Sequence, residues 1–388
     1  LMCFDETNSI KELVSSFSVK NSLRRGVYMN GNVNLLQDLL NDMPVDVLLL
    51  KSKTIKNWLG TLNGSGCSII VSRKYQGLLV DQRYFAEAKE KEHDLTIELL
   101  ASQSEEAIYV KLYELSEKYN WKCLGVESES TLASTYLKLS KQFKNVVLLD
   151  KELTILRAIK TSEEIKKIRK AINVTDEIFK EVSSQIKEGM TEYEISALVQ
   201  YKSICRGAQK MSFDTICGIG ERTAYPHCRP TSRALKRGEH VMIDFGIQID
   251  NYQSDMTRIC FLGEPNTKIL EIYNIVQSAQ NAGISSIKAG VDSEEVDRCA
   301  RSVILRAGYG EYFGHGLGHG IGIDNSTELP LLRPGKHFIL KEGMVMSCEP
   351  GIYIPGVGGV RIENDVAVIN GVGVSLNKTT TDPIILGV

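Results

Sequence analysis

The sequence predicts an α/β chain of two domains, an N-terminal α/β domain over residues 1–152 and a C-terminal domain over residues 153–388. Three observations support this prediction. Strand and helix patterns alternate early in the chain, a helix start signal marks the boundary, and a repeated segment follows it. A chain of 388 residues is long enough for two domains.

The N-terminal domain is predicted from apolar segments that alternate with an amphipathic one. Residues 101–120, ASQSEEAIYVKLYELSEKYN, have apolar residues at helical spacing. Short apolar segments with strand character occupy residues 45–50, 66–72, 77–85 and 144–150. Such alternation is typical of a sheet covered by helices.

The C-terminal domain is expected to begin with a long helix over residues 161–186. Thr161 and Glu164 form a capping-box signature at its start, so we place the boundary near 151–155.

A repeat follows this helix, because IKEGMTEYEI at 186–195 aligns with IKAGVDSEEV at 287–296. Each copy has a glycine that suits a helix end or a sharp turn, and then a helix cap, Thr191 or Asp292. Two unrelated helix-turn-helix segments with the same caps would give the same pattern. A genuine repeat implies two similar halves, and active sites commonly lie between such halves.

The composition excludes some partners. The 46 basic and 48 acidic residues give a net charge of −2, which does not favour nucleic acid or an anionic membrane as a partner. No apolar run approaches the roughly 18 residues of a spanning helix, and the first residues lack a secretory signal pattern. The nine cysteines are scattered without a CxxC pair, as expected for a reduced, cytoplasmic protein.

Two predicted hairpins each carry a pair of acids. Residues 241–261 place Asp244 and Asp255 on one face, about 5–8 Å apart, around a turn at Asp250 and Asn251. Two like charges that close need a counter-charge or a shared proton.

Residues 345–365 repeat this arrangement, with Glu349 and Glu363 on strands around the turn PGVGG. Exposed hairpin acids are the plain alternative for either pair taken alone. The segments VMIDFG and VMSCEP, however, embed their acids in apolar strands, where an unpaired buried carboxylate is costly.

Between the hairpins lies FGHGLGHGIG at residues 313–322, with His315 and His319 four residues apart. A zinc-protease helix is excluded, because each interior glycine costs roughly 1 kcal/mol and the expected Glu is missing. In extended backbone the two imidazoles share a face about 13 Å apart. We therefore expect one histidine on a metal and the other facing substrate, with the glycines allowing a ligand to approach the backbone closely. Two incidental surface histidines in a glycine-rich loop are the alternative.

Four carboxylates and one neutral imidazole would balance two divalent cations. Oxygen-rich ligation favours Mn²⁺, Co²⁺ or Mg²⁺ over a thiolate-type zinc site. Two such ions lower the pKa of water and polarise a carbonyl or phosphoryl oxygen, so the residues predict a two-metal hydrolase.

Several segments resemble the pita-bread metallopeptidases, in their Xaa-Pro aminopeptidase and prolidase branch. The resemblance covers 155–388 through TAYPHCRPTSRALKRGEHVMIDFG, YQSDMTR, FGHGLGHGIG, SCEPGIYIPG and GGVRIEND. More weakly, WLGTLNGSGCSIIVS and LLVDQRYFAEA are similar to the creatinase-like N-terminal domain. The fold implied is a creatinase-like α/β domain followed by a pita-bread catalytic domain with a pseudo-twofold α+β arrangement.

The resemblance implies five metal ligands. Asp244 would hold one ion, Asp255 and Glu363 would bridge two, and His319 and Glu349 would hold the other. Glu349 would also accept the proton of the attacking water. The ions implied are two Mn²⁺, with Co²⁺ and Zn²⁺ as alternatives.

The resemblance also implies a substrate side of the site. His227 and His315 would face the scissile bond, and Arg361 would lie beside the metals. Tyr353 and Thr257 would support them. The remaining histidines, His93, His240 and His337, are interpreted as structural or exposed.

One position departs from the family pattern. Proline-preferring relatives carry a further His seven residues after the metal His, where this chain has Ser326. This puts the proline pocket in doubt but leaves the metal ligands complete.

The function expected is a cytoplasmic, homodimeric Xaa-Pro aminopeptidase that removes a residue preceding proline from the N-terminus of a peptide. Three alternatives remain open. They are a dipeptide-specific prolidase, a non-catalytic binding module of the same fold, and a two-metal phosphoesterase, for which no phosphate cradle is seen.

Overall fold

The computed structural model describes residues 31–91 and 95–387, so His93 and residues 1–30 lie outside the described part. The chain divides into two compact units between Leu156 and Arg157, within helix α7 (Asp150–Ala158). Across the described residues, every helix is too short or too polar to span a bilayer.

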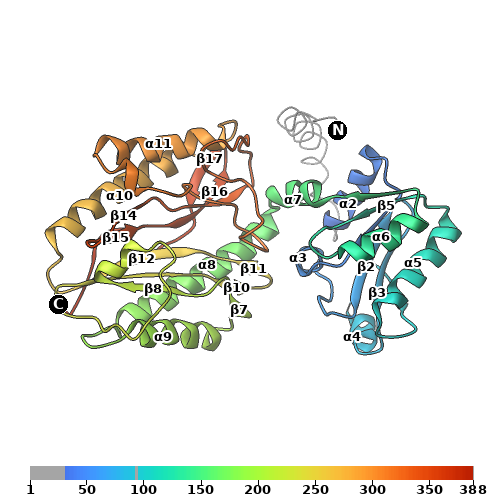
Figure 1. Ribbon diagram of the computed structural model, residues 1–388, viewed down its shortest axis with the longest axis horizontal. Helices are drawn as coiled ribbons and strands as arrows, with labels where there is room; N and C mark the ends of the chain where they lie inside the picture. The colour runs from blue at the N-terminus through green and yellow to red at the C-terminus, as the bar shows by residue number, and fades with distance from the viewer. Residues whose placement is uncertain (1–30, 92–94, 388) are drawn as a thin grey trace. The chain divides into compact units, whose positions relative to one another are not determined.

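The first unit is one mixed sheet in the strand order β4-β3-β2-β1-β5-β6 (Figure 1). Its strands are Val47–Leu50 (β1), Cys67–Ser72 (β2), Gln76–Val80 (β3), Thr96–Leu99 (β4), Cys123–Val126 (β5) and Asn145–Leu148 (β6). Its helices are Gly31–Asp42 (α2), Lys53–Trp58 (α3), Phe85–Glu90 (α4), Glu105–Tyr119 (α5) and Ala133–Gln142 (α6). The predicted strand at 77–85 is too long, because Asp81 accepts a hydrogen bond from the Arg83 amide and turns the chain toward α4.

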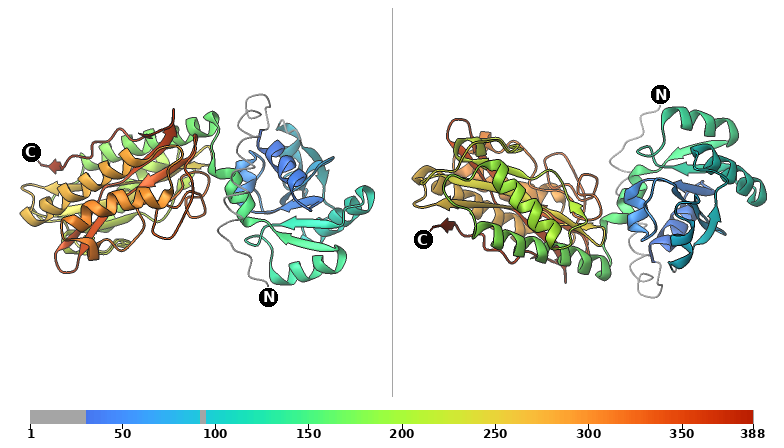
Figure 2. Two further views of the ribbon diagram at one scale, coloured as in Figure 1. Left: turned by 90° about the horizontal axis from the view of Figure 1, so that it is seen from above. Right: turned by 90° about the horizontal axis from the view of Figure 1, so that it is seen from below.

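The second unit places its strands between two pairs of helices, α8 with α9 on one side and α10 with α11 on the other (Figures 1 and 2). The helices are Ser162–Ser183 (α8), Glu192–Cys205 (α9), Gly220–Ala224 (η1), Thr267–Ser286 (α10), Ser293–Arg306 (α11) and Gly310–Tyr312 (η2). The strands up to the second pair of helices are Lys210–Met211 (β7), Ile216–Ile219 (β8), His240–Phe245 (β9), Ile247–Ile249 (β10), Tyr252–Gln253 (β11) and Met256–Leu262 (β12). The later strands are Val345–Cys348 (β13), Gly351–Ile354 (β14), Gly358–Arg361 (β15), Asn364–Ile369 (β16), Val372–Ser375 (β17) and Ile384–Leu386 (β18).

Helix α8 starts as predicted. Thr161 caps it by accepting a hydrogen bond from the Glu164 amide, and the Glu164 carboxylate accepts one from the Thr161 amide, which completes the capping box.

The repeat recurs in the backbone hydrogen bonds of the second unit. The amides of Gly189 and Gly290, both at positive φ, donate to the carbonyls of Leu235 and Leu340, each at 2.8 Å. The match therefore extends to LKRGEHVMID and LKEGMVMSCE, whose strands are β9 and β13. Two similar halves result, each sending one acid-bearing strand to the middle of the unit.

The caps of the two copies differ. Thr191 forms a reciprocal capping box with Glu194, whereas Asp292 caps its helix by accepting from the Glu294 amide without a reciprocal bond.

The first acid hairpin forms from β9 and β12, which pair antiparallel with Asp244 opposite Thr257. Asp255, two residues before Thr257, is therefore a diagonal neighbour of Asp244. The predicted single strand over 241–249 is wrong, because Gly246 breaks it into β9 and β10. A Cβ at Gly246 would lie 1.9 Å from the Ser254 carbonyl oxygen.

The second acid hairpin is interrupted in the middle. β13 pairs with β16 and β14 pairs with β15 in one continuous register, which runs from Cys348 opposite Asn364 to Gly351 opposite Arg361. Glu349 and Glu363 occupy matching positions at the interruption between these pairings.

Candidate active site

The segment 313–322 is extended where it passes β13, as predicted, and not helical. The Ser347 amide donates to the His319 carbonyl and the Glu349 amide donates to the Leu317 carbonyl, both at 2.8 Å. On the other edge, the Leu332 amide donates to the Gly318 carbonyl at 2.8 Å. The histidine segment is therefore enclosed between two stretches of backbone.

This enclosure explains two of the glycines. A Cβ at Gly318 would lie 2.1 Å from the Ser347 carbonyl oxygen, and one at Gly320 would lie 2.5 Å from the Leu329 carbonyl oxygen. The sequence reasoning assigned the glycines to a closely approaching ligand, but at these two positions the close neighbour is protein backbone.

All eight candidate site residues line one cavity of about 750 Å³ in the second unit. They are His227, Asp244, Asp255, His315, His319, Glu349, Arg361 and Glu363. Residues separated by more than a hundred positions in the chain therefore meet at one place.

Four carboxylates form one side of the cavity, which we call the acidic wall: Asp244, Asp255, Glu349 and Glu363. His319 lies against them, with its Nε2 atom 3.6 Å from Asp255 Oδ2 and 3.5 Å from Glu349 Oε1. One ligand atom each from Asp255, His319 and Glu363 lie within 4.8 Å of one another, close enough to share a metal ion.

The acidic wall is electrostatically unfavourable without cations. Burial, followed by the charge of Glu363, raises the pKa of Asp255 well above its ordinary value, and burial likewise raises that of Glu363. Among the described residues, Asp244 Oδ1 and Glu363 Oε1 are buried without a hydrogen-bond partner. Unpartnered carboxylate oxygens beside one imidazole nitrogen are a suitable donor set for divalent cations.

Arg361 connects the acidic wall to its surroundings. Its guanidinium pairs with Asp244 and donates to the Tyr353 hydroxyl at 2.8 Å and to Thr257 Oγ1 at 3.0 Å. Thr257 in turn donates to Glu363 at 2.7 Å. Burial acts to lower the pKa of Arg361, but the neighbouring Tyr353 and the acids hold it well above its ordinary value.

The two histidines of the glycine segment have fixed tautomers. His319 Nδ1 lies 3.0 Å from the Gly320 carbonyl and His315 Nδ1 lies 2.7 Å from the Gly316 carbonyl. Because a carbonyl only accepts, each Nδ1 carries a hydrogen, which leaves Nε2 as the ring nitrogen that a neutral imidazole offers to a partner. The Nε2 of His319 lies near the acids, as a metal ligand requires.

Two further histidines line the cavity, His227 and His315, which we call the histidine rim. His315 Nε2 lies 2.9 Å from the Tyr353 hydroxyl, and burial lowers the pKa of His315, which favours a neutral ring. His227 is exposed and lines the cavity from the segment after η1.

Sequence reasoning missed two residues that support the acidic wall. The buried Asp365 accepts a hydrogen bond from the Asp255 amide at 2.9 Å. Ser347 donates to Glu349 at 3.0 Å and accepts from the His319 amide at 3.0 Å. Asp365 could have been suspected because it follows Glu363 by two positions on the same strand face.

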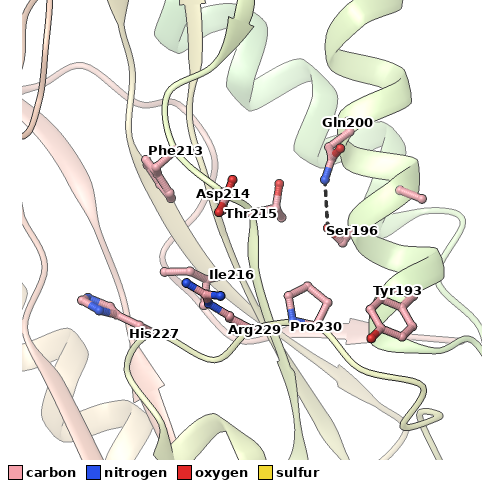
Figure 3. Close-up of a pocket in the computed structure, with 11 residues that line it drawn as sticks. Tyr193, Ser196, Gln200, Phe213, Asp214, Thr215, Ile216, His227, Arg229 and Pro230 are labelled. Carbon is pink, nitrogen blue, oxygen red and sulfur yellow. Dashed lines mark hydrogen bonds between the residues drawn. The ribbon is translucent and has the colours of Figure 1, made fainter.

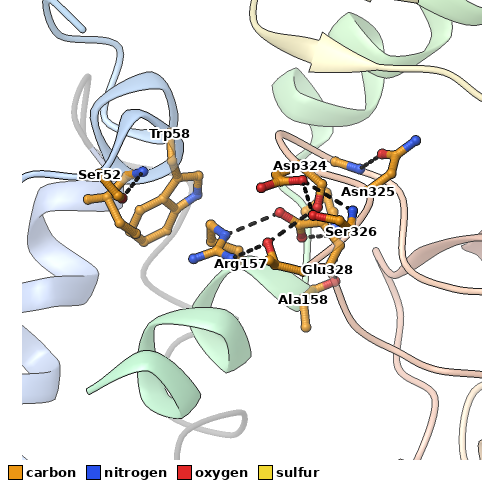
Figure 4. A network of polar contacts seen from close by, with 12 residues as sticks. Ser52, Trp58, Arg157, Ala158, Asp324, Asn325, Ser326 and Glu328 are labelled. Atoms are coloured by element: carbon orange, nitrogen blue, oxygen red, sulfur yellow. Dashed lines mark hydrogen bonds and ion pairs between the residues drawn. The ribbon is translucent and has the colours of Figure 1, made fainter. Parts of the chain in front are cut away.

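Ser326 does not replace the family's further histidine. It is exposed, donates to Asp324 Oδ1 at 2.6 Å and is not among the residues that line the cavity (Figure 4). Nearby, the buried Glu328 accepts from Arg157 at 3.1 Å and from Lys160 at 3.0 Å, which anchors the loop that leads to the cavity wall.

The other histidines are structural or exposed as interpreted, within the described residues. His240 is buried and bonded to Thr223 at 2.8 Å, and His337 is exposed beside Asp292.

The fold and this cavity define the class of protein. Residues 166–370 match metallopeptidase family M24, and residues 33–159 match the creatinase/prolidase N-terminal domain. The chain belongs to metallopeptidase family M24 and is a peptide hydrolase with the predicted two-domain fold.

Among its relatives, the chain is similar to an Xaa-Pro dipeptidase of Pyrococcus horikoshii, 35% identical over 353 residues that cover 90% of this chain and 98% of that protein. It is similar to the solved Xaa-Pro dipeptidase from Bacillus anthracis, with a TM-score of 0.86, 33% identity and coverage of 91% and 99% of the two chains. It is also similar to the X-Pro aminopeptidase from Thermotoga maritima, with a TM-score of 0.83, 32% identity and coverage of 89% and 99%.

Proposed function

We propose that the chain is an Xaa-Pro dipeptidase, which hydrolyses the bond between the first residue and proline in a dipeptide. The observation that carries the proposal is the meeting of the acidic wall, His319 and a neutral His315 in one cavity. The sequence placed an aminopeptidase first and a dipeptidase second. Similarity over nine tenths of the chain to proteins named Xaa-Pro dipeptidase favours the second.

The metal proposal is two divalent cations, Mn²⁺ with Co²⁺ and Zn²⁺ as alternatives. The residues that would hold them are Asp244, Asp255, His319, Glu349 and Glu363. The chemistry such ions supply is polarisation of the scissile carbonyl and a lower pKa for water.

Within this proposal, Glu349 receives the proton of the attacking water. Its carboxylate is only partly buried, opens onto the cavity and is oriented by Ser347. The proline nitrogen has no N–H and leaves as an amine only after it gains a proton, which Glu349 returns to it. His315, held by Tyr353, presents a neutral ring to the substrate.

The preference for dipeptides is assigned to Arg333. This side chain lines the cavity, is exposed and, among the described residues, has no hydrogen bond or ion pair. It packs closely over Gly316, where a Cβ would lie 2.6 Å from Arg333 Cβ. A free guanidinium at this position suits the terminal carboxylate of a dipeptide, which a longer peptide lacks there.

The test compares Ala-Pro, Ala-Pro-amide and Ala-Pro-Ala with added Mn²⁺. A dipeptidase cleaves Ala-Pro with the highest kcat/KM, and Arg333→Gln raises KM for Ala-Pro about tenfold while leaving Ala-Pro-amide unchanged. Equal or better cleavage of Ala-Pro-Ala would favour the aminopeptidase, the activity of the similar Thermotoga maritima protein. Absence of both turnover and bound metal would favour a binding module.

The cellular setting proposed is cytoplasmic, and the assembly proposed is a homodimer. Light scattering on purified protein tests the assembly, and a mass equal to one chain of 43.2 kDa would refute it.

A further inference from the structure

A second pocket of about 620 Å³ adjoins the catalytic cavity (Figure 3). It lies between helix α9 and the segments 213–216 and 227–230. Phe213, Ile216 and His227 line both the pocket and the cavity. In Figure 3 the α9 residues lie on one side of the pocket and His227 on the other.

The second pocket contains two opposite charges that the protein leaves free. Asp214 and Arg229 line this pocket and not the catalytic cavity, and both are exposed. Among the described residues, neither side chain has a hydrogen bond or an ion pair. Both charges are therefore available to a ligand, and a ligand that carries one charge of each sign would be complementary to them.

A buried hydroxyl in the wall supports the same conclusion. Thr215 is 3% exposed, and its Oγ1 atom has no partner among the described residues. An unpaired buried hydroxyl in a native structure needs an explanation, and a polar ligand or its water is one. The rest of the wall is suited to small organic ligands, because it combines the Phe213 and Pro230 rings with the polar Ser196 and Gln200.

We propose that the second pocket binds a zwitterion, either a free L-amino acid or a short peptide. Its ammonium group would pair with Asp214 and its carboxylate with Arg229, while an apolar side chain packs on Phe213 and Pro230. The volume is within the range of small-molecule sites.

The segment that carries Arg229 also carries His227, two residues earlier, so the pocket is mechanically linked to the histidine rim. This segment is held firmly. The Arg229 carbonyl accepts from Arg222 at 2.8 Å, and the fully buried Glu192 accepts from the Thr231 amide at 2.8 Å. Because His227 itself lines both the second pocket and the catalytic cavity, a ligand in the pocket would contact or displace its side chain and so change the KM for substrate. The predicted change in KM rests on the proposed function, whereas the binding of a zwitterion to the second pocket does not.

The test of binding is calorimetry on the Mn²⁺-treated full chain with four compounds: L-leucine, leucyl-leucine, leucine amide and N-acetylleucine. Asp214→Asn is expected to lower the affinity for L-leucine and for leucine amide about tenfold and to leave the affinity for N-acetylleucine unchanged. Arg229→Gln is expected to lower the affinity for L-leucine and for N-acetylleucine and to leave the affinity for leucine amide unchanged. If L-leucine binds more tightly than uncleaved leucyl-leucine, the ligand is a free amino acid. The reverse order identifies a short peptide.

Surface variants control for the change in net charge. Asp250→Asn and Arg298→Gln remove exposed charges that are not part of the pocket lining and should bind all four compounds as the wild type does. Circular dichroism checks that each variant is folded. Unchanged L-leucine affinity in both pocket variants, or equal losses in the surface variants, would overturn the proposed site.

The linkage to His227 has its own readout. Saturating L-leucine should shift the KM for Ala-Pro in the wild type and leave it unshifted in Arg229→Gln. An equal shift in both proteins would place the effect at the catalytic cavity and refute the linkage. A chain that shows the charge-matched binding losses but does not cleave Ala-Pro would refute the proposed function and leave the second pocket standing.

Discussion

The acidic wall and His315 line one cavity but differ in their electrostatic state. Asp244, Asp255 and Glu363 are almost fully buried, and burial raises the pKa of each. His315 is held by Tyr353 with a lowered pKa, so it is neutral near pH 7. Both ring nitrogens of His315 already have a partner in the protein, whereas Asp244 Oδ1 and Glu363 Oε1 have none among the described residues.

This difference teaches that a site can be folded and still require its cations. The scaffold fixes the acids through backbone pairing and through Thr257, Ser347 and Asp365. Within the described residues, the one ion pair that a Lys or Arg makes with the wall joins Arg361 to Asp244. Variants in the wall should therefore lose metal, and variants in the rim should lose turnover alone.

The largest effect is expected at Asp255, where burial is followed by the charges of neighbouring acids as the main causes of its raised pKa and where His319 lies 3.6 Å away. Asp255→Asn should lower kcat/KM by at least about 10³-fold and release at least one metal ion, because the lost ligand removes several kcal/mol of charge stabilisation. Metal analysis and Ala-Pro kinetics measure both. Asp250→Asn in the exposed turn is the matched control. Full turnover by Asp255→Asn would contradict its place in the wall.

The next effect is expected at Arg361, where the rim and the wall meet. Arg361→Met leaves Asp244 without its cation, and removing one partner of a buried pair costs about 3–5 kcal/mol. Loss of stability should be measured by denaturant unfolding, with and without Mn²⁺. Added Mn²⁺ should recover part of the loss by neutralising Asp244, and a variant that Mn²⁺ does not stabilise would argue against ligation there.

His315→Ala separates the two sides directly. It should lower kcat about 10²-fold while metal content stays at the wild-type level, because His315 faces the substrate and bonds Tyr353. His319→Ala is the comparison variant and should lose metal. If the metal leaves His315→Ala instead, the roles of the two histidines are reversed.

A smaller effect tests the glycine segment that carries both histidines. Gly318→Ala forces a Cβ against the Ser347 carbonyl oxygen and should cost about 1–3 kcal/mol in the free energy of unfolding. Gly314→Ala, in the same segment, has nothing within 4 Å of its Cβ and should change stability little. Equal losses in the two variants would show that glycine flexibility, and not close backbone packing, explains the motif.

The last prediction concerns the pH dependence of the stability of the metal-free protein. An unfolded chain releases carboxyl protons from about pH 4 upward, whereas folded Asp255 and Glu363, with raised pKa values, keep theirs. Their stability contribution is therefore full below about pH 4 and is lost as pH rises, by up to about 1.4 kcal/mol per pH unit for each proton. Melting curves in EDTA should show that the stability of Asp255→Asn relative to the wild type increases from pH 5 to pH 8. A difference that does not change with pH would contradict the raised pKa.

Much of this site could be anticipated from local pattern. The apolar segments VMIDFG and VMSCEP indicated that their acids are buried, and glycine content excluded a helix for His315 and His319. The same reasoning failed at Gly246, because a strand that looks continuous is broken by the Ser254 carbonyl. It also missed Asp365, whose partner is the Asp255 amide more than a hundred residues away.

The sequence by itself determined the residue types, the caps, the strand faces and the family, because these depend on neighbours a few positions apart. Only the tertiary structure decided which carboxylate oxygens remain unpartnered, which nitrogen of each imidazole is free, and that Asp214 and Arg229 share a second pocket. Those properties arise from packing between distant segments, where burial and hydrogen-bond geometry set the electrostatics, and no local pattern encodes them.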